Sequence, residues 1–149
     1  MFGLLGARGA QFVDGTPPEP PSLEMLADPG FDDPSKWTSA GGSTVTGSQL
    51  ISQDDSGAAP TFGALRPEAG DFDAGSTYRL LSTVGVLPGG SVFRILLYSV
   101  GGTQLIGEYS SSAPIDQTFV ADNTYTAVQV SFFELGIRLN DLSVELVPP

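Results

Sequence analysis

The chain has 149 residues, a length that fits one domain with a single hydrophobic core. It carries 6 Lys plus Arg against 17 Asp plus Glu, so its formal net charge is −11 and we expect no binding to nucleic acid or to an anionic membrane surface. It contains no Cys and no His, which excludes a Ser–His–Asp triad, a Cys–His dyad and a zinc site built from these ligands.

Residues 1–22 have the composition of an extended N-terminal arm. Apolar residues separated by glycines come first, and the proline-rich stretch TPPEPP follows at residues 16–21. A polyproline segment is stiff and cannot pair inside a sheet, so it separates the apolar tip from the folded domain. The large apolar side chains of the tip are predicted to bind a partner, and they are Phe2, Leu4, Leu5 and Phe12. The alternative is an unstructured terminus.

Residues 23–149 form the predicted folded domain. Leu23–Leu26 is a short strand or a helical turn, and a turn-rich segment then ends on Trp37. Short apolar or alternating runs separated by turn residues predict strands at Ser43–Thr46, Gln49–Ser52, Thr61–Leu65, Thr77–Val86, Ser91–Val100, Thr103–Ser110, Gln117–Val120, Thr126–Phe133, Ile137–Leu139 and Asp141–Val147. No stretch shows sustained helical periodicity, so the predicted fold class is all-β, a sandwich or a barrel of short strands.

The second half of the chain carries the clearest pairing patterns. The run from Val92 to Tyr98 is apolar on both faces, which predicts a central strand. Gly101-Gly102 follows it and predicts a two-residue hairpin turn into the next strand. A turn at Pro88-Gly89-Gly90 precedes it.

Three short motifs follow one another along the domain. They are Asp28-Pro29-Gly30-Phe31 with Trp37 nearby, the sequence AGSTYRL at Ala74–Leu80, and the sequence IRLNDLSV at Ile137–Val144. In this order they resemble the opening turn, a strand entry and the closing strand of carbohydrate-binding-module-like jelly rolls, which are related to galactose-binding domains. The resemblance spans residues 28–146 and implies that the fold is an antiparallel β-sandwich, a jelly roll, preceded by the extended N-terminal arm. It also implies that Trp37 packs in the core.

The resemblance implies two kinds of candidate site. Sugar-binding members stack their ligand on exposed Trp or Tyr side chains, so Tyr98, Tyr109 and Tyr125 are candidates for a ligand platform. The family often holds a structural calcium ion, for which Asp32 and Asp141 are candidate oxygen ligands. The alternative for these two aspartates is an ordinary position in a solvated turn. No other cofactor is expected.

A glycosidase requires two carboxylic acids on either side of the bond to be cleaved. The candidates lie in predicted loops or strands without any pattern that pairs them, and they are Asp54, Asp55, Asp71, Asp73, Glu108 and Glu134. The chain is therefore predicted to have no catalytic residues and not to be an enzyme.

Two functional hypotheses follow. The first is a non-enzymatic structural protein of a viral particle, a phage virion, in which the arm inserts between capsid or tail subunits and the jelly roll forms a decoration or fibre module. It carries the expectations of a virion location, synthesis without a signal peptide, and assembly as a homo-oligomer. The alternative is a carbohydrate-binding module that recognises a glycan on a host cell surface.

Overall fold

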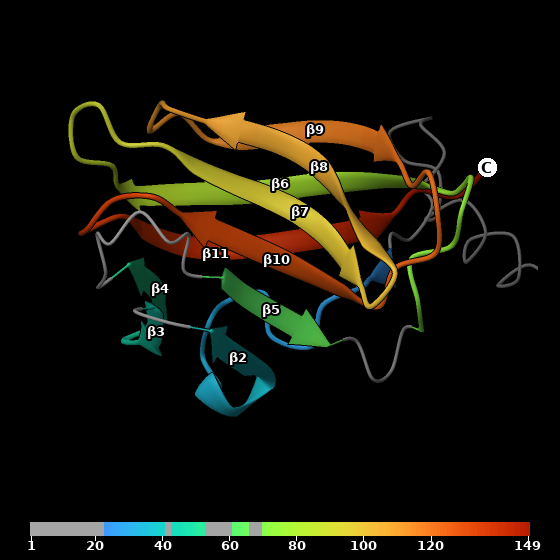
Figure 1. The fold of residues 1–149 in the computed structure, drawn as a ribbon, viewed down its shortest axis with the longest axis horizontal. Helices are drawn as coiled ribbons and strands as arrows, with labels where there is room; N and C mark the ends of the chain where they lie inside the picture. Colours follow the sequence, from blue (N-terminus) through green and yellow to red (C-terminus); the bar gives the residue numbers. More distant parts are fainter. Residues whose placement is uncertain (1–22, 41–42, 53–60, 66–69) are drawn as a thin grey trace, which may run out of the picture.

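The computed structural model describes residues 23–40, 43–52, 61–65 and 70–149, which form two antiparallel sheets packed face to face (Figure 1). The first sheet has the strand order β3-β4-β11-β6-β9, and β1 also pairs with β11. The second sheet has the order β2-β5-β10-β7-β8. The predicted all-β antiparallel sandwich is confirmed. The predicted arm at residues 1–22, with Phe2, Leu4, Leu5 and Phe12, lies outside the described residues.

The described strands range in length from two residues in β1 to ten in β6. The first sheet contains β1 (Leu23–Glu24), β3 (Ser43–Thr46), β4 (Gln49–Ser52), β6 (Thr77–Val86), β9 (Ile115–Val120) and β11 (Arg138–Leu146). The second sheet contains β2 (Trp37–Ala40), β5 (Thr61–Leu65), β7 (Phe93–Ser99), β8 (Gly102–Tyr109) and β10 (Ala127–Phe132). A 3-10 turn, η2 (Pro34–Lys36), precedes β2. Among the described residues, no helix has the length and hydropathy needed to cross a membrane.

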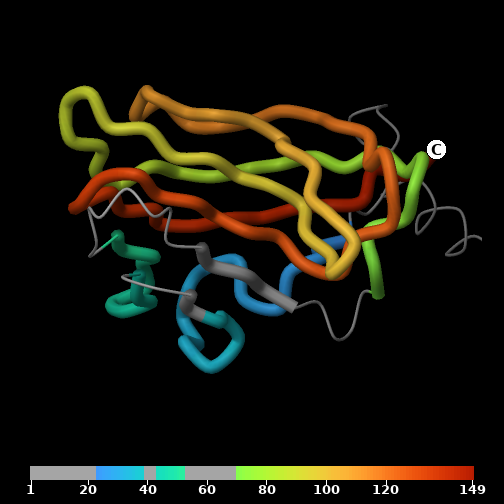
Figure 2. Tube along the Cα trace, viewed as in Figure 1, coloured from blue at the N-terminus to red at the C-terminus, as the bar shows by residue number. Residues whose placement is uncertain are grey.

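Strand alternation places the core between the sheets. On β7, Phe93, Ile95 and Leu97 are fully buried, whereas Arg94 and Tyr98 point outward. The neighbouring strand β10 and the facing strands β6 and β11 supply further fully buried side chains, namely Leu80, Val128, Val130, Phe132, Leu139, Leu142 and Val144. The two ends of the described chain lie together, because β1 pairs with the end of β11, and the β8–β9 connection lies at the opposite end of the sandwich (Figure 2).

The opening motif ties the start of the domain to its closing strand. The buried carboxylate of Asp28 accepts hydrogen bonds from the backbone N–H groups of Asp32 and Asp33 and from the indole Nε1 of Trp37, at 2.9, 3.1 and 2.9 Å. Trp37 is 6% exposed, so its predicted position in the core is confirmed. The carbonyl oxygen of Pro29 accepts from the backbone N–H of Leu142 on β11. The first and third motifs therefore meet in space.

Three details differ from the sequence predictions. Ile137–Leu139 and Asp141–Val147 belong to one strand, β11, because register shifts on either side of Leu139 keep it paired with β6. The segment ending on Trp37 leads into β2, which pairs with β5 and was not predicted. In the β7–β8 hairpin Ser99 pairs with Gly102, so the two turn residues are Val100 and Gly101, not Gly101 and Gly102.

The predicted turn at Pro88 is confirmed, with Gly90 at φ +81° as a type II turn requires.

Candidate functional site

The outer faces of the two sheets differ in chemistry. On the first sheet the outward side chains of β6, β9 and β11 are mostly polar or charged, and they include Arg79, Asp116, Thr118, Asp141 and Glu145. Arg79 forms a two-point ion pair with Asp116, with both nitrogen–oxygen distances at 2.8 Å. In the described part of this face no aromatic side chain is exposed. The described part of this face therefore offers no flat aromatic surface for a ligand.

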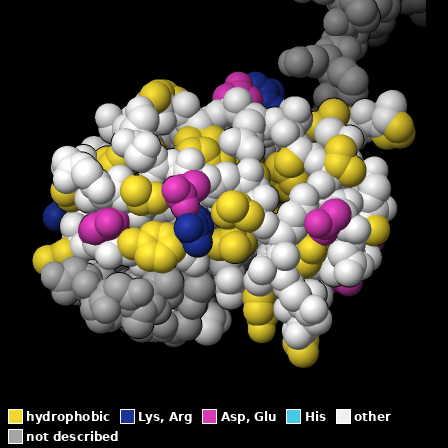
Figure 3. Space-filling model, turned by 45° about the horizontal axis from the view of Figure 1, so that its top comes forward, with side chains coloured by type: hydrophobic (Ala, Val, Ile, Leu, Met, Phe, Trp, Pro, Cys, Tyr) yellow, Lys and Arg dark blue, Asp and Glu magenta, His cyan; other side chains and the backbone are white. Residues whose placement is uncertain are grey.

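The outer face of the second sheet carries exposed apolar and aromatic side chains on β7 and β8. Tyr98 is 37% exposed and Leu105 is 51% exposed, and Leu96, half-buried, pairs with Leu105 across the strands. We call this surface the β7–β8 face and define it by the outward side chains of Arg94, Leu96, Tyr98, Leu105, Glu108, Gln129 and Phe133. Figure 3 shows a basic and an acidic side chain in contact on this side of the molecule, with hydrophobic side chains on either side of them.

A bulge in β8 brings Leu105 and Glu108 to the same face. Alternation alone would place residues three apart on opposite faces of a strand. Leu96 pairs with Leu105 and Ile95 pairs with Gly107, so Ile106 is an extra residue that shifts the register between them. A bulge of this kind redirects the side chains that follow it. Glu108 consequently points outward, opposite Arg94.

Two contacts hold the Arg94 side chain in place, one with Glu108 and one with Phe133. Its Nε donates to the carboxylate of Glu108 at 2.6 Å, and its guanidinium carbon lies 4.9 Å from the centre of the Phe133 ring. A guanidinium over an aromatic ring is attracted by the electron density of the ring face. The Arg94 side chain is therefore ordered before any ligand arrives, which lowers the entropy cost of using it in binding.

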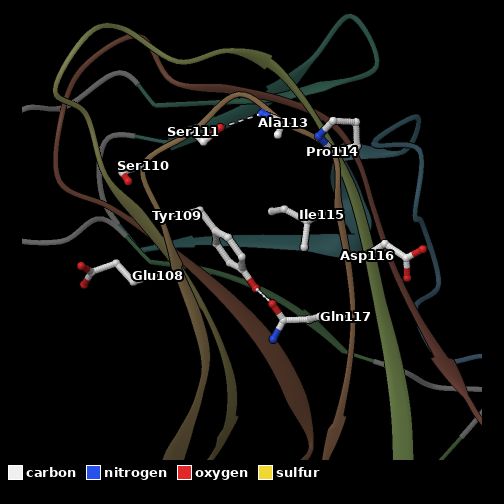
Figure 4. Close-up of a pocket in the computed structure, with 9 residues that line it drawn as sticks. All are labelled: Glu108, Tyr109, Ser110, Ser111, Ala113, Pro114, Ile115, Asp116 and Gln117. Atoms are coloured by element: carbon white, nitrogen blue, oxygen red, sulfur yellow. Dashed lines mark hydrogen bonds between the residues drawn. The ribbon is translucent and has the colours of Figure 1, made fainter.

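A hollow separate from the β7–β8 face lies at the edge of the sandwich, beneath the β8–β9 connection. It has a volume of about 390 Å³, and Tyr109, Ile115 and Gln117 point into it, while Glu108 and Asp116 point away (Figure 4). The Tyr109 hydroxyl donates to Gln117, and the Gln117 amide donates to the carbonyl oxygen of Ile106. These polar groups already bond to one another. The hollow is thus a less suitable ligand site than the β7–β8 face.

The chemistry of Tyr109 reflects its position in this edge hollow. Burial raises the pKa of the Tyr109 phenol to about 12. The ring packs against Phe93, with ring centres 5.3 Å apart. Gly107 is required beside it, because a Cβ at that position would overlap the Tyr109 ring. Tyr109 is accordingly a half-buried residue that packs against the core at the edge of the sandwich.

The structure separates the three tyrosines proposed as a platform. Tyr98 lies on the β7–β8 face, Tyr109 points between the sheets, and Tyr125 is 4% exposed with its hydroxyl donating to Asp122 at 2.6 Å. The hydrogen bond to Asp122 is the main reason that the pKa of Tyr125 is raised, and burial adds to it. The three rings do not share a face. The expectation of a joint platform is wrong, and only Tyr98 keeps an exposed position.

The candidate calcium ligands each have a partner within the chain. Asp32 accepts from the Ser48 hydroxyl at 2.6 Å, and Asp141 accepts from the backbone N–H of Thr83 at 2.7 Å. Among the described residues, no group of three or more carboxylates is arranged to hold a metal ion. These residues do not fit the six to eight oxygen ligands that calcium prefers. A structural calcium ion remains a sequence prediction without support from the geometry.

The acids considered for catalysis are used in other ways where the structure describes them. Glu108 pairs with Arg94, and Glu134 accepts from the backbone N–H of Val92 at 2.8 Å. Asp71 and Asp73 lie beside the exposed turn before β6, and Asp54 and Asp55 lie outside the described residues. The absence of enzymatic activity stays a prediction.

Among solved structures, the chain is similar in fold to family 29 carbohydrate-binding modules. A family 29 carbohydrate-binding module from Piromyces equi superposes with a TM-score of 0.58 at 11% identity, over 85% of this chain and 91% of that one. An arginine-to-alanine mutant of another family 29 module gives 0.56 at 16% identity, covering 84% and 91%. A lysine-to-alanine mutant complexed with cellulohexaose gives 0.55 at 13% identity, covering 84% and 90%. At these identities the likeness shows the fold.

Sequence comparison adds no family. No family model matches the chain, and no curated protein matches it by sequence. The virion hypothesis gains no support from the solved structures.

The sequence contained a pattern that pointed to the β7–β8 face. The run from Val92 to Tyr98 is apolar on both faces, and in the structure Leu96 and Tyr98 lie on the face that is open to solvent. Antiparallel sandwiches usually have polar outer faces. The apolar outer face of β7 is therefore the feature that the sequence pattern marks, whereas no pattern marks Phe133 or Leu105.

Proposed function

We propose that this domain is a non-catalytic carbohydrate-binding module and that it binds a glycan chain on the β7–β8 face. The observation that carries the proposal is the exposed Tyr98 ring, which lies with Leu96 and Leu105 beside the ordered Arg94–Glu108 pair. The fold shared with family 29 carbohydrate-binding modules supports it.

The chemistry of the face suits a sugar ring. A pyranose has an apolar face of C–H groups and a rim of hydroxyl groups, so it needs a flat apolar surface with polar groups at its edges. The Tyr98 ring provides the flat surface, since aromatic rings combine a large contact area with little conformational entropy to lose. Arg94 and Glu108 supply a donor and an acceptor, and the half-buried amide of Gln129 supplies both.

The length of the face suits an oligosaccharide. Ala127 pairs with Tyr98, and Phe133 lies at the other end of β10, so the distance along the strand is about 20 Å. This is long enough for several consecutive sugar rings. A ligand that contacts both Tyr98 and Arg94 would be fixed in both position and direction.

The proposal is tested with cellohexaose, the ligand named in one of the similar structures, together with a panel of soluble plant and bacterial polysaccharides. We expect saturable binding by calorimetry and ¹⁵N chemical-shift changes concentrated on β7, β8 and β10. Shift changes on the outer face of β6 and β9 would place the site elsewhere. No saturable binding to any member of the panel would overturn the proposed function.

The virion hypothesis depends on residues 1–22, which lie outside the described residues. Its further expectations, a homo-oligomer and a virion location, also stay predictions. Light scattering of the full chain measures the first of them directly.

A further inference from the structure

The charged pair on the β7–β8 face has capacity left for a ligand. The Arg94–Glu108 contact uses Nε of the arginine and one carboxylate oxygen, at 2.6 Å. In the described part of the chain, neither the two Nη groups of Arg94 nor the second oxygen of Glu108 has another hydrogen-bond partner. Both side chains are nearly half exposed, at 44% and 48%. Donors and an acceptor therefore stand side by side in the middle of an apolar surface.

The Arg94–Glu108 pair contributes little to the free energy of folding. Exposed ion pairs contribute little to the free energy of folding, because solvent screens them and two long side chains must be ordered. An arginine on its own would bind sugar hydroxyls through its Nη groups. Glu108 is needed neither for stability nor for this binding of hydroxyl groups, so we expect its role to be in the choice of ligand.

The reason concerns the charge of the ligand. A free guanidinium is the best protein partner for a carboxylate, since its planar fork donates two parallel hydrogen bonds. Glu108 neutralises that fork and adds its own negative charge, on a chain whose net charge is already −11. A sugar carboxylate placed at Arg94 would also face Glu108, whereas a neutral diol would find both a donor and an acceptor.

We infer that Glu108 is a specificity-determining residue that excludes acidic sugars, so that the β7–β8 face selects neutral glycans over uronates. This inference rests on the proposed function. It assigns the Arg94–Glu108 pair a task in discrimination, and Tyr98 with Leu96 and Leu105 the task of holding the sugar rings.

The substitution Glu108→Gln isolates the charge. Glutamine keeps a carbonyl oxygen that accepts from Arg94 Nε, so the arginine stays in place while its fork becomes available to a carboxylate. The chain offers a matched control in Asp116→Asn. Asp116 also pairs with an arginine, Arg79, at similar exposure, but on the outer face of the first sheet. Both substitutions raise the net charge by one unit.

The ligands are matched in the same way. One is cellohexaose, and the other is the β-1,4-linked hexamer of glucuronate, which has the same linkage and ring stereochemistry but a carboxylate at C6 of each ring. Calorimetric titrations compare the wild type, Glu108→Gln and Asp116→Asn at low and high salt, after melting curves confirm that each variant is folded.

We expect the wild type to bind cellohexaose and to bind the glucuronate hexamer at least about fivefold more weakly. Glu108→Gln should gain at least about fivefold for the glucuronate hexamer, and the gain should shrink in high salt. Asp116→Asn should leave the preference unchanged. The inference is overturned if Glu108→Gln gains no affinity for glucuronate, or if Asp116→Asn gains as much. Absence of wild-type binding to cellohexaose and to the polysaccharide panel counts against the proposed function instead.

Discussion

The guanidinium of Arg94 lies over the ring of Phe133, with its central carbon 4.9 Å from the ring centre. The contact joins β7 to the residue that follows β10, two strands that are neighbours in the second sheet. Phe133 thereby acts as a positioning residue. It holds the arginine in the orientation in which its Nη groups remain available above the sheet.

Replacing Phe133 by leucine keeps apolar bulk and removes the aromatic face. An exposed cation–π contact is worth about 0.5 to 1 kcal/mol, so we expect affinity for cellohexaose to fall about threefold. Calorimetric titration measures the effect, and a melting curve shows whether the fold is intact. Wild-type affinity in a folded Phe133→Leu variant would show that the ring does not position Arg94 for binding.

Truncating Leu105 tests the apolar part of the face. Leu105→Ala should weaken binding several-fold, because it removes contact area beside Tyr98 without opening the core. Leu135→Ala is the matched control, since Leu135 has nearly the same exposure, 52% against 51%, and lies in the connection between β10 and β11. Equal effects of the two substitutions on affinity would contradict the assignment of the face.

Most of the fold could be predicted from turn chemistry and alternation. The bounds of β3, β4, β5 and β6 agree with the predicted strands, because each is a run of alternating or apolar residues between turn-forming residues. β2 could not be predicted in this way. It consists of Trp37–Ala40, with the sequence WTSA, and it is a strand because it pairs with β5, which is distant in sequence.

Less of the candidate site was predictable, for reasons of register. Tyr109 and Tyr125 were proposed with Tyr98 by residue type, but the face on which a side chain lies depends on strand pairing and on bulges. The extra residue Ile106 in β8 is the example, since it changes the phase between Leu105 and Glu108. No sequence pattern marks that bulge, and therefore the pairing of Glu108 with Arg94 was not foreseen.

The buried carboxylate of Asp28 should be important for stability. It accepts hydrogen bonds from two backbone N–H groups and from the Trp37 indole. In Asp28→Asn the amide nitrogen cannot accept, so at least one of these donors is left unpaired in a buried place. We expect unfolding in urea to show a loss of about 2 to 3 kcal/mol.

Asp33→Asn is the control for this stability measurement. Asp33 is exposed and caps η2 by accepting from Ser35, contacts that lower the pKa of its carboxyl. Asparagine is an equally good cap, so the urea midpoint should barely move. A midpoint shift in Asp28→Asn no larger than that in Asp33→Asn would contradict the role given to Asp28.

The raised pKa of Tyr109 predicts that the protein loses stability at alkaline pH. The pKa of the phenol is raised from 10.0 to about 12 in the folded chain. Because the folded state holds the proton more tightly, this stabilisation is fully present below about pH 10 and is lost as the pH rises toward 12. Absorbance titration of the phenolates should show an ionisation step near pH 12 that Tyr109→Phe removes. A titration curve in which Tyr109→Phe removes a step near pH 10 would contradict the assignment.

The most direct test of the central claim is calorimetric titration of Tyr98→Ala and Tyr98→Phe with cellohexaose. If sugar rings stack on Tyr98, Tyr98→Ala should lose at least about tenfold in affinity, while Tyr98→Phe, which keeps the ring, should stay within about threefold of the wild type. Both variants should melt near the wild-type temperature, since the side chain lies outside the core. Wild-type affinity in a folded Tyr98→Ala variant would contradict glycan binding on the β7–β8 face.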